Sequence, residues 1–115
     1  MQEHLRLRRA EDFQRLRQEG VTQPHRLMLL SFSQNERTHN RYGFIVGKRL
    51  GKAVTRNRIR RRLREVVRAL DPLLKPGYDV VLVARQPLAQ QPFDVVMRTV
   101  NDLFRRAELL KGETE

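Results

Sequence analysis

The 115-residue sequence contains no cysteine, so disulfides and thiolate metal ligands are excluded. Long apolar runs are missing too: runs such as Leu27 to Leu30 are far too short for a helix that spans a bilayer. The first residues, MQEHLRLRRAEDF, are charged and lack the apolar core of a signal peptide. We therefore expect a soluble cytoplasmic protein that does not span a membrane.

Acidic residues are also scarce, with 13 Asp and Glu against 24 Lys and Arg, and the formal net charge is +11. A balance this basic indicates a polyanionic partner, for which RNA, DNA and an anionic membrane surface are the candidates. The length suits one domain. We predict a single domain over residues 1–115, with flexible ends at 1–9 and 111–115.

Residues that could carry catalysis by the protein itself are dispersed. The aspartates fall in different expected elements without the spacing of metal ligands, and the histidines fall in the N-terminal segment and expected loops. There is no nucleophile–base pair and no glycine-rich phosphate loop. We therefore expect no catalytic residue and no metal site in the protein, although acids can still converge in space. The residues considered are Asp12, Asp71, Asp79, Asp94, Asp102, His4, His25 and His39.

The basic residues concentrate in one stretch. Lys48 to Arg68 holds ten of the 24 Lys and Arg residues and a single acid, Glu65. Thr55 is a residue type that accepts backbone N–H bonds at a helix start. After it, apolar residues recur at helical spacing and predict an amphipathic helix. The apolar stripe is Ile59, Leu63, Val66, Val67 and Leu70. The opposite face carries Asn57, Arg61, Arg64 and Arg68. One flank carries Arg58 and Arg62, and the other carries Arg60.

An ordinary surface helix mixes charges of both signs. Here arginines neighbour arginines, which costs stability unless a polyanion binds, and the planar guanidinium suits phosphate. A solvated charged face is the weaker interpretation, and nucleic-acid binding is the stronger one. Asn57 could cap the start of the helix or hydrogen-bond RNA. The basic loop from Gly47 to Lys52 could be a plain connection or follow a phosphate backbone.

The remaining elements predict an α+β protein. Residues 10–19 and a segment from Phe93 to near Leu110 have helical patterns, while 26–33, 42–47 and 78–84 have strand patterns. We expect the first two strands to pair antiparallel, because their connection is short. The order is α-β-β-α-β-α, a two-layer sandwich of helices on a small sheet.

The run GKRLGKAVTRNRIRRRLRE resembles the signature of the bacterial ribonuclease P protein subunit, in which a Lys- and Gly-containing loop leads into an Arg-Asn-Arg helix. The resemblance covers nearly the whole chain, since EDF at 11–13, YGFIVGKRLGKAV, YDVVLVAR and LFRRAELL follow in family order. It implies a mixed sheet with an unusual left-handed β-α-β crossover. That handedness departs from the usual rule.

The resemblance also implies the function. The family's protein is the non-catalytic, RNA-binding subunit of a tRNA-processing endoribonuclease, a hydrolase whose active site and required Mg²⁺ belong to the RNA. The partners implied are the catalytic RNA and precursor tRNA, with a monomeric protein in a 1:1 complex that is inactive without RNA. The implied RNA-binding residues are Lys48, Arg49, Lys52, Arg56, Asn57, Arg58, Arg60, Arg61, Arg64 and Arg68.

The family holds the 5′ leader of precursor tRNA in a cleft between the sheet and a helix. Phe13 matches one aromatic position of that cleft, and Arg17 stands near a second position that is often aromatic. Phe32 is the expected aromatic of the first strand, with Ser31 as the competitor if the register shifts by one. Both phenylalanines could equally be core residues.

Three other functions compete with this interpretation. A ribosomal-type RNA-binding protein has the same composition, but the long Lys-Gly to Arg-Asn-Arg pattern disfavours it. A metal-dependent protein nuclease needs clustered acids, which the sequence does not show. A DNA-binding regulator would need paired helices at helix-turn-helix spacing, which are not evident.

Overall fold

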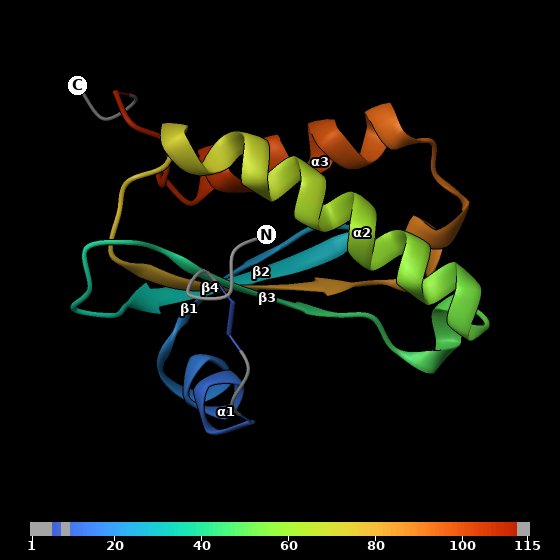
Figure 1. The fold of residues 1–115 in the computed structure, drawn as a ribbon, viewed down its shortest axis with the longest axis horizontal. Helices are drawn as coiled ribbons and strands as arrows, with labels where there is room; N and C mark the ends of the chain where they lie inside the picture. The colour runs from blue at the N-terminus through green and yellow to red at the C-terminus, as the bar shows by residue number, and fades with distance from the viewer. Residues whose placement is uncertain (1–5, 8–9, 113–115) are drawn as a thin grey trace.

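A four-stranded mixed sheet carries two helices on one face and one on the other (Figure 1). The computed structural model describes residues 6–7 and 10–112. The elements, in chain order, are α1 (Ala10–Glu19), β1 (Val21–Pro24), β2 (Met28–Gln34), β3 (Arg41–Ile45), α2 (Ala53–Leu70), β4 (Tyr78–Ala84) and α3 (Phe93–Arg106), with short 3-10 turns at Lys48–Leu50, Asp71–Leu73 and Gln86–Gln90.

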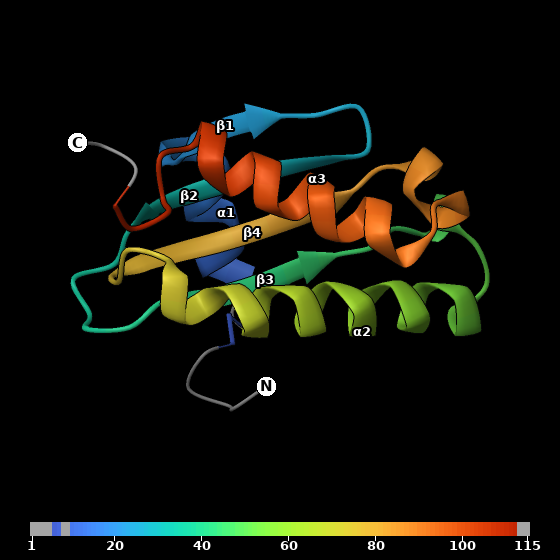
Figure 2. The same cartoon turned by 90° about the horizontal axis from the view of Figure 1, so that it is seen from above.

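The strands lie in the order β1-β2-β4-β3. β4 pairs antiparallel with β2 and parallel with β3, so that Leu82 lies opposite Leu30 on one side and Phe44 on the other. The parallel pair is joined through α2. Seen from the helix side in Figure 2, β3 and β4 run in the same direction and α2 returns in front of them, which makes this crossover left-handed. The implied handedness, which is rare in proteins, is thus present.

Two expectations about the sheet were wrong. β1 was not foreseen, because it is short, exposed and contains Pro24, which is tolerated only at an edge where no ladder N–H is needed. β2 and β3 do not pair, because β4 lies between them. β4 is buried along nearly its whole length and therefore occupies the centre of the sheet.

Alternate residues of β4 face two separate cores. Val80, Leu82 and Ala84 join the large core under α2 and α3, whereas Val81 packs with Leu16 in a small core under α1. The small core has few members, so α1 rests on the sheet with little apolar contact. Polar interactions must therefore help to fix α1.

α2 begins earlier than Thr55, which was wrongly expected to cap it. The N-terminal cap is Lys52, without a side-chain hydrogen bond, and Gly51 before it has a φ of 137° that favours glycine. At the other end, the buried Tyr42 hydroxyl bonds to Asp71, and burial followed by this bond raises the pKa of Tyr42. α2 is thereby tied to β3.

The last helix is shorter than expected. α3 ends at Arg106 rather than near Leu110, because the chain turns at Glu108 with a φ of 60°.

Parts of the expected flexible ends are fixed. The Leu7 amide donates to the Tyr42 carbonyl at 2.8 Å and its side chain is buried, because it completes the small core. The Lys111 amide donates to the Leu73 carbonyl at 2.8 Å. Arg6 and Gly112 are also described. The rest of the predicted flexible ends lies outside the described residues, at 1–5, 8–9 and 113–115, as does His4.

We expect Leu63→Ala to lower the free energy of unfolding by about 2–5 kcal/mol, because its fully buried side chain anchors α2 to the large core. Val54→Ala, at an 80% exposed position of the same helix, should change it by less than about 0.5 kcal/mol. Urea unfolding of both variants tests this. A small loss for Leu63→Ala would contradict the packing of α2.

Candidate nucleic-acid interface

The outward side of α2 is a basic surface. Burial of Ile59, Leu63, Val66 and Val67 against the sheet and α3 leaves the other faces of α2 in solvent. The loop before the helix adds further exposed cations. The exposed polar residues that were predicted to bind RNA are Lys48, Arg49, Lys52, Asn57, Arg58, Arg61 and Arg68. We call these seven residues the outer α2 surface.

Three other arginines of α2 have contacts within the protein. The Arg56 Nε donates to the Gly51 carbonyl at 3.1 Å and closes the start of the helix. Arg60 donates to the Asn57 Oδ1 at 3.0 Å. Asn57 lies within α2 and is not its cap, because the cap is Lys52. The Arg62 guanidinium lies 5.9 Å from the ring centroid of Phe93 and so leans toward α3.

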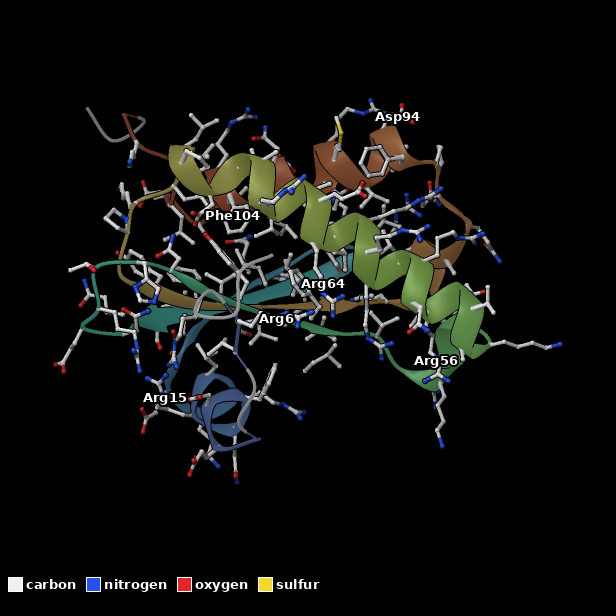
Figure 3. All side chains as sticks on the ribbon, in the orientation of Figure 1. Arg6, Arg15, Arg56, Arg64, Asp94 and Phe104 are labelled. Carbon is white, nitrogen blue, oxygen red and sulfur yellow. The ribbon has the colours of Figure 1, made fainter. Side chains whose placement is uncertain are left out.

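Arg60 and Arg64 turn to a pocket beside β3, although Arg64 was expected on the outward face. The pocket has a volume of about 220 Å³. Figure 3 shows Arg64 next to Arg6 beneath α2. The remaining lining residues are Leu7, Phe13, Tyr42, Gly43 and Phe44. Arginine thus meets aromatic side chains here, which is a combination that suits phosphate and base together.

The charges in this pocket are not balanced. Burial, followed by the charges of Arg6 and Arg60, lowers the pKa of Arg64. Among the described residues, the buried Arg64 Nε has no hydrogen-bond partner. An anion in the pocket would supply both the missing acceptor and the missing negative charge.

A second hollow continues from the first along α1. Phe13 lines both, and the second is completed by Gln14, Arg17, Gln18 and Ile45 with a volume of about 590 Å³. A Cβ at position 43 would lie 2.5 Å from the Phe13 ring and would clash with it, so the position of this ring requires glycine at residue 43. The structure thus brings Phe13 and Arg17 together, as predicted. We call the two hollows the α1 cleft.

Phe32 does not line this cleft, and that expectation was wrong. It packs on the large core with its ring 6.0 Å from Tyr78 in an edge-on arrangement. Ser31 pairs with Val81, whose side chain faces α1, so Ser31 lies on the α1 face of the sheet, although it is not among the lining residues of the α1 cleft. Because side chains alternate along a strand, the one-residue difference moves Phe32 to the opposite face of the sheet.

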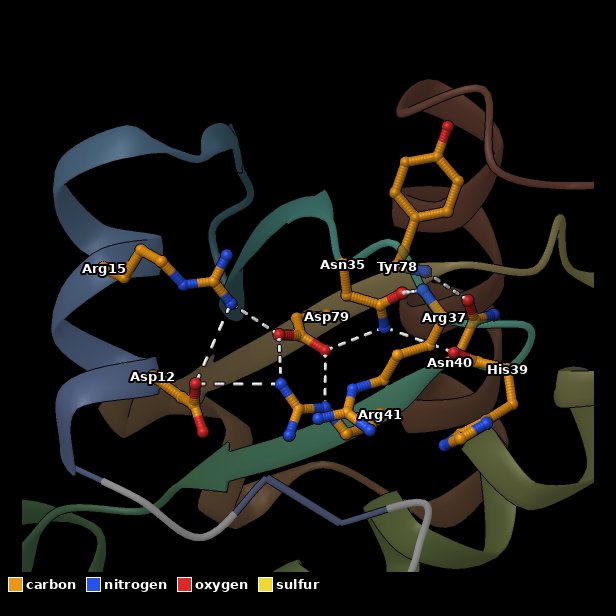
Figure 4. Close-up of polar contacts among 9 residues, drawn as sticks. All are labelled: Asp12, Arg15, Asn35, Arg37, His39, Asn40, Arg41, Tyr78 and Asp79. Atoms are coloured by element: carbon orange, nitrogen blue, oxygen red, sulfur yellow. Dashed lines mark hydrogen bonds and ion pairs between the residues drawn. The ribbon is translucent and has the colours of Figure 1, made fainter.

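Asp79 fixes α1 on the sheet (Figure 4). Its side chain is fully buried, and its two oxygens accept from Arg41 at 2.9 and 2.7 Å and from Arg15 at 2.6 Å. Asn35 donates to the same carboxylate at 2.9 Å. Asp12 lies 3.7 Å from Arg41 and 3.9 Å from Arg15. One buried carboxylate therefore joins α1, β3, β4 and the loop after β2.

These donors decide the charge of Asp79. Burial alone would raise the pKa of Asp79, but the hydrogen bonds from Arg41 and Asn35 outweigh it and hold the pKa below its usual value. The hydrogen bond to Asp79 correspondingly raises the pKa of Arg41. The sequence carried a signal for this network, because an aspartate in the apolar strand YDVVLVA needs a buried partner. The partners Arg15 and Arg41, and Arg6 in the pocket, were missed.

Within residues 6–7 and 10–112, no three His, Cys, Asp or Glu side chains gather as a metal-binding group. None of the described helices has the length and hydropathy to cross a membrane. The fold and the basic surfaces define a small α+β domain of the nucleic-acid-binding class.

Comparison with known proteins gives the family. The model of the family described as Ribonuclease P matches residues 1–108. The chain is 46% identical over 113 residues to the ribonuclease P protein component of Roseiflexus castenholzii, covering 97% of this chain and 93% of that protein. It is 44% identical over 115 residues to that of Chloroflexus aurantiacus, covering 99% and 85%. The chain belongs to the ribonuclease P protein family.

Solved structures agree with this assignment. The RNase P protein of Staphylococcus aureus superposes with a TM-score of 0.87 at 28% identity, covering 93% of this chain and 98% of that one. That of Thermotoga maritima gives a TM-score of 0.79 at 30% identity, covering 87% and 96%. Membership gives the chain a role in an RNA-cleaving ribonucleoprotein that contains an RNA subunit.

We expect Asp79→Asn to lower the free energy of unfolding at neutral pH by about 3–5 kcal/mol, because Arg41 and Arg15 lose their buried counter-charge. The pKa of Asp79 is lowered by folding, so its stabilisation is present above the unfolded pKa of about 3.9 and is lost as pH falls through the folded pKa. The variant should therefore lose stability less steeply with acid.

Denaturant unfolding from pH 7 to pH 2 checks both effects. Asp94→Asn is the matched control, since this carboxylate is 70% exposed and pairs with Arg98 at 3.4 Å. Its removal should cost no more than about 1 kcal/mol. Equal losses for the two variants would show that the Asp79 network does not secure α1.

Proposed function

We propose that the chain is the non-catalytic protein subunit of ribonuclease P, which binds the catalytic RNA and the 5′ leader of precursor tRNA. In this role it assists the endonucleolytic removal of the leader. One observation carries the proposal: α2 presents two distinct basic sites, its outer surface to solvent and Arg60 and Arg64 to the α1 cleft. A subunit that must hold two RNAs at once needs such a division.

The outer α2 surface is proposed to bind the catalytic RNA. From Lys48 to Arg68 ten cations stand against the single acid Glu65. The side chains of Arg58, Arg61 and Arg68 are exposed. Arginine offers phosphate a planar pair of donors. Each neutralised phosphate releases counterions, so the affinity should fall steeply with salt.

The α1 cleft is proposed to hold the leader. Leaders vary in sequence, so they must be bound without reading bases. Stacking on Phe13 and phosphate contacts from Arg17, Arg60 and Arg64 tolerate any sequence. The Asp79 network supports this by holding α1, and hence Phe13, at a fixed distance from the sheet.

The chemistry of cleavage is proposed to lie in the RNA subunit together with its Mg²⁺. The protein's part is to bind and position both RNAs and to offset the repulsion between them, since it adds a formal charge of +11 to the complex. We propose a 1:1 complex with a protein monomer in the cytoplasm.

We expect Arg58→Ala and Arg61→Ala each to weaken binding of a bacterial ribonuclease P RNA about threefold to tenfold at moderate salt. Each should lower the slope of log affinity against log salt by roughly 0.7–0.9, because one phosphate contact is lost. Filter binding between 50 and 300 mM salt measures both quantities.

Arg37→Ala removes the same charge from an exposed loop residue outside the proposed sites and serves as the control. It should leave the salt slope within about 0.3 of the wild-type value. If Arg58→Ala and Arg61→Ala resembled this control, the outer α2 surface would not be the contact for the catalytic RNA.

We expect Phe13→Ala to weaken binding of precursor tRNA to the reconstituted complex by about fivefold to a hundredfold, because one base stack is worth about 1–3 kcal/mol. Binding of mature tRNA, which has no leader, should change by less than twofold. Competition binding with both tRNAs gives the ratio.

Phe32→Ala is the matched control, since this ring packs on the large core and not in the α1 cleft. It should lower stability without discriminating between the two tRNAs. Equal losses on precursor and mature tRNA for Phe13→Ala would make Phe13 a core residue and not a leader contact.

A further inference from the structure

Five arginines and a histidine gather around α3, the turn between β1 and β2, and the end of β4. His25 and Arg26 lie between β1 and β2, and Arg85 follows β4. Arg98, Arg105 and Arg106 lie on α3. Figure 2 places β1 and α2 along opposite sides of the sheet, with α3 between them. We call these six residues the β1/α3 surface.

Two hydrogen bonds of Leu27 hold the turn before β2 against the end of β4. The Arg85 amide donates to the Leu27 carbonyl at 2.9 Å, which brings the turn before β2 against the end of β4. The Leu27 amide donates to the His25 Nδ1 at 3.0 Å, which fixes the imidazole at the same point. Arg26 and Arg85 are thus neighbours through geometry, although they are far apart in sequence.

Acids balance only part of the charge. Asp94 pairs with Arg98 at 3.4 Å, and Asp102 pairs with Arg106 at 3.0 Å. Arg26 and Arg85 are exposed, and neither makes an ion pair with any residue in the described part of the chain. The surface therefore carries an excess of positive charge centred on these two arginines.

A shallow groove of about 530 Å³ crosses the surface. His25, Arg26, Arg98 and Arg105 line it together with the acid Asp102, and the uncharged Thr99 and Asn101 add hydrogen-bonding groups. Burial, then Arg106, Arg26 and Arg85, lower the pKa of His25 against the opposing effect of Asp102. The lowered pKa favours the neutral imidazole, so the positive charge of the surface comes from the arginines.

We infer that the β1/α3 surface binds the sugar–phosphate backbone of a second RNA segment, distinct from the segment on the outer α2 surface. Guanidinium groups match phosphate oxygens, and the groove mixes such groups with neutral donors. The molecule measures 38 × 31 × 26 Å, so two contacts on opposite sides require two separate stretches of RNA. The inference rests on the proposed function, because it takes the ribonucleoprotein as the source of that RNA.

Charge reversal tests the inference in the assembled complex. Arg26→Glu and Arg85→Glu should each weaken binding of a bacterial ribonuclease P RNA about fivefold or more and reduce the salt slope by about one contact. Arg37→Glu makes the same charge change at an exposed residue elsewhere and should alter affinity less than twofold. Hydroxyl-radical footprints should lose one protected RNA segment with Arg26→Glu and a different one with Arg61→Glu.

Thermal unfolding checks that the variants are folded. Arg26→Gln removes the charge without reversing it and should therefore weaken RNA binding less than Arg26→Glu does. If Arg26→Glu and Arg85→Glu bound RNA as Arg37→Glu does, the second RNA contact would be refuted while the proposed function stood. Loss of the same protected segment in Arg26→Glu and Arg61→Glu would also refute it. If the wild-type chain failed to bind the RNA, the proposed function would fail, and the inference with it.

Discussion

The packing of one stripe of α2 on the sheet is the constraint on which the rest of the structure depends. Ile59, Leu63, Val66 and Val67 are buried, and because the helix is rigid their burial dictates where each arginine lies. The left-handed crossover places this helix beside β3, at the edge of the sheet. One helix can therefore present arginines both to solvent and to the α1 cleft.

The α1 cleft exists because α1 is held on the sheet mainly by polar contacts. A well-filled apolar interface would leave no room for a ligand, and the small core under α1 has only a few members. The Asp79 network supplies the fixation that this core lacks. The arrangement combines a fixed helix with an open cleft, which is the preorganisation that a binding site needs.

The sequence predicted the elements whose patterns are local. The stripe of α2, the limits of β4 and the first helix all follow from periodicity and composition. The features that depend on contacts between distant residues could not be predicted from the sequence. β1 is too short and exposed to show a pattern, and the neighbours of β4 depend on the crossover. The site was predicted in part. Phe13, Arg58, Arg61 and Arg68 lie as expected, whereas Arg64 turns to the α1 cleft. Arg6 and the Asp79 partners meet only in the folded chain, and the face of Phe32 depended on a one-residue register.

The most direct test of the central claim is cleavage of precursor tRNA by a bacterial ribonuclease P RNA at limiting Mg²⁺, with and without this protein. The account predicts strong stimulation by the protein and no cleavage by the protein alone. Tight RNA binding without stimulation would contradict it in favour of an RNA-binding protein with another partner. Cleavage by the RNA-free protein would contradict the assignment of catalysis to the RNA subunit.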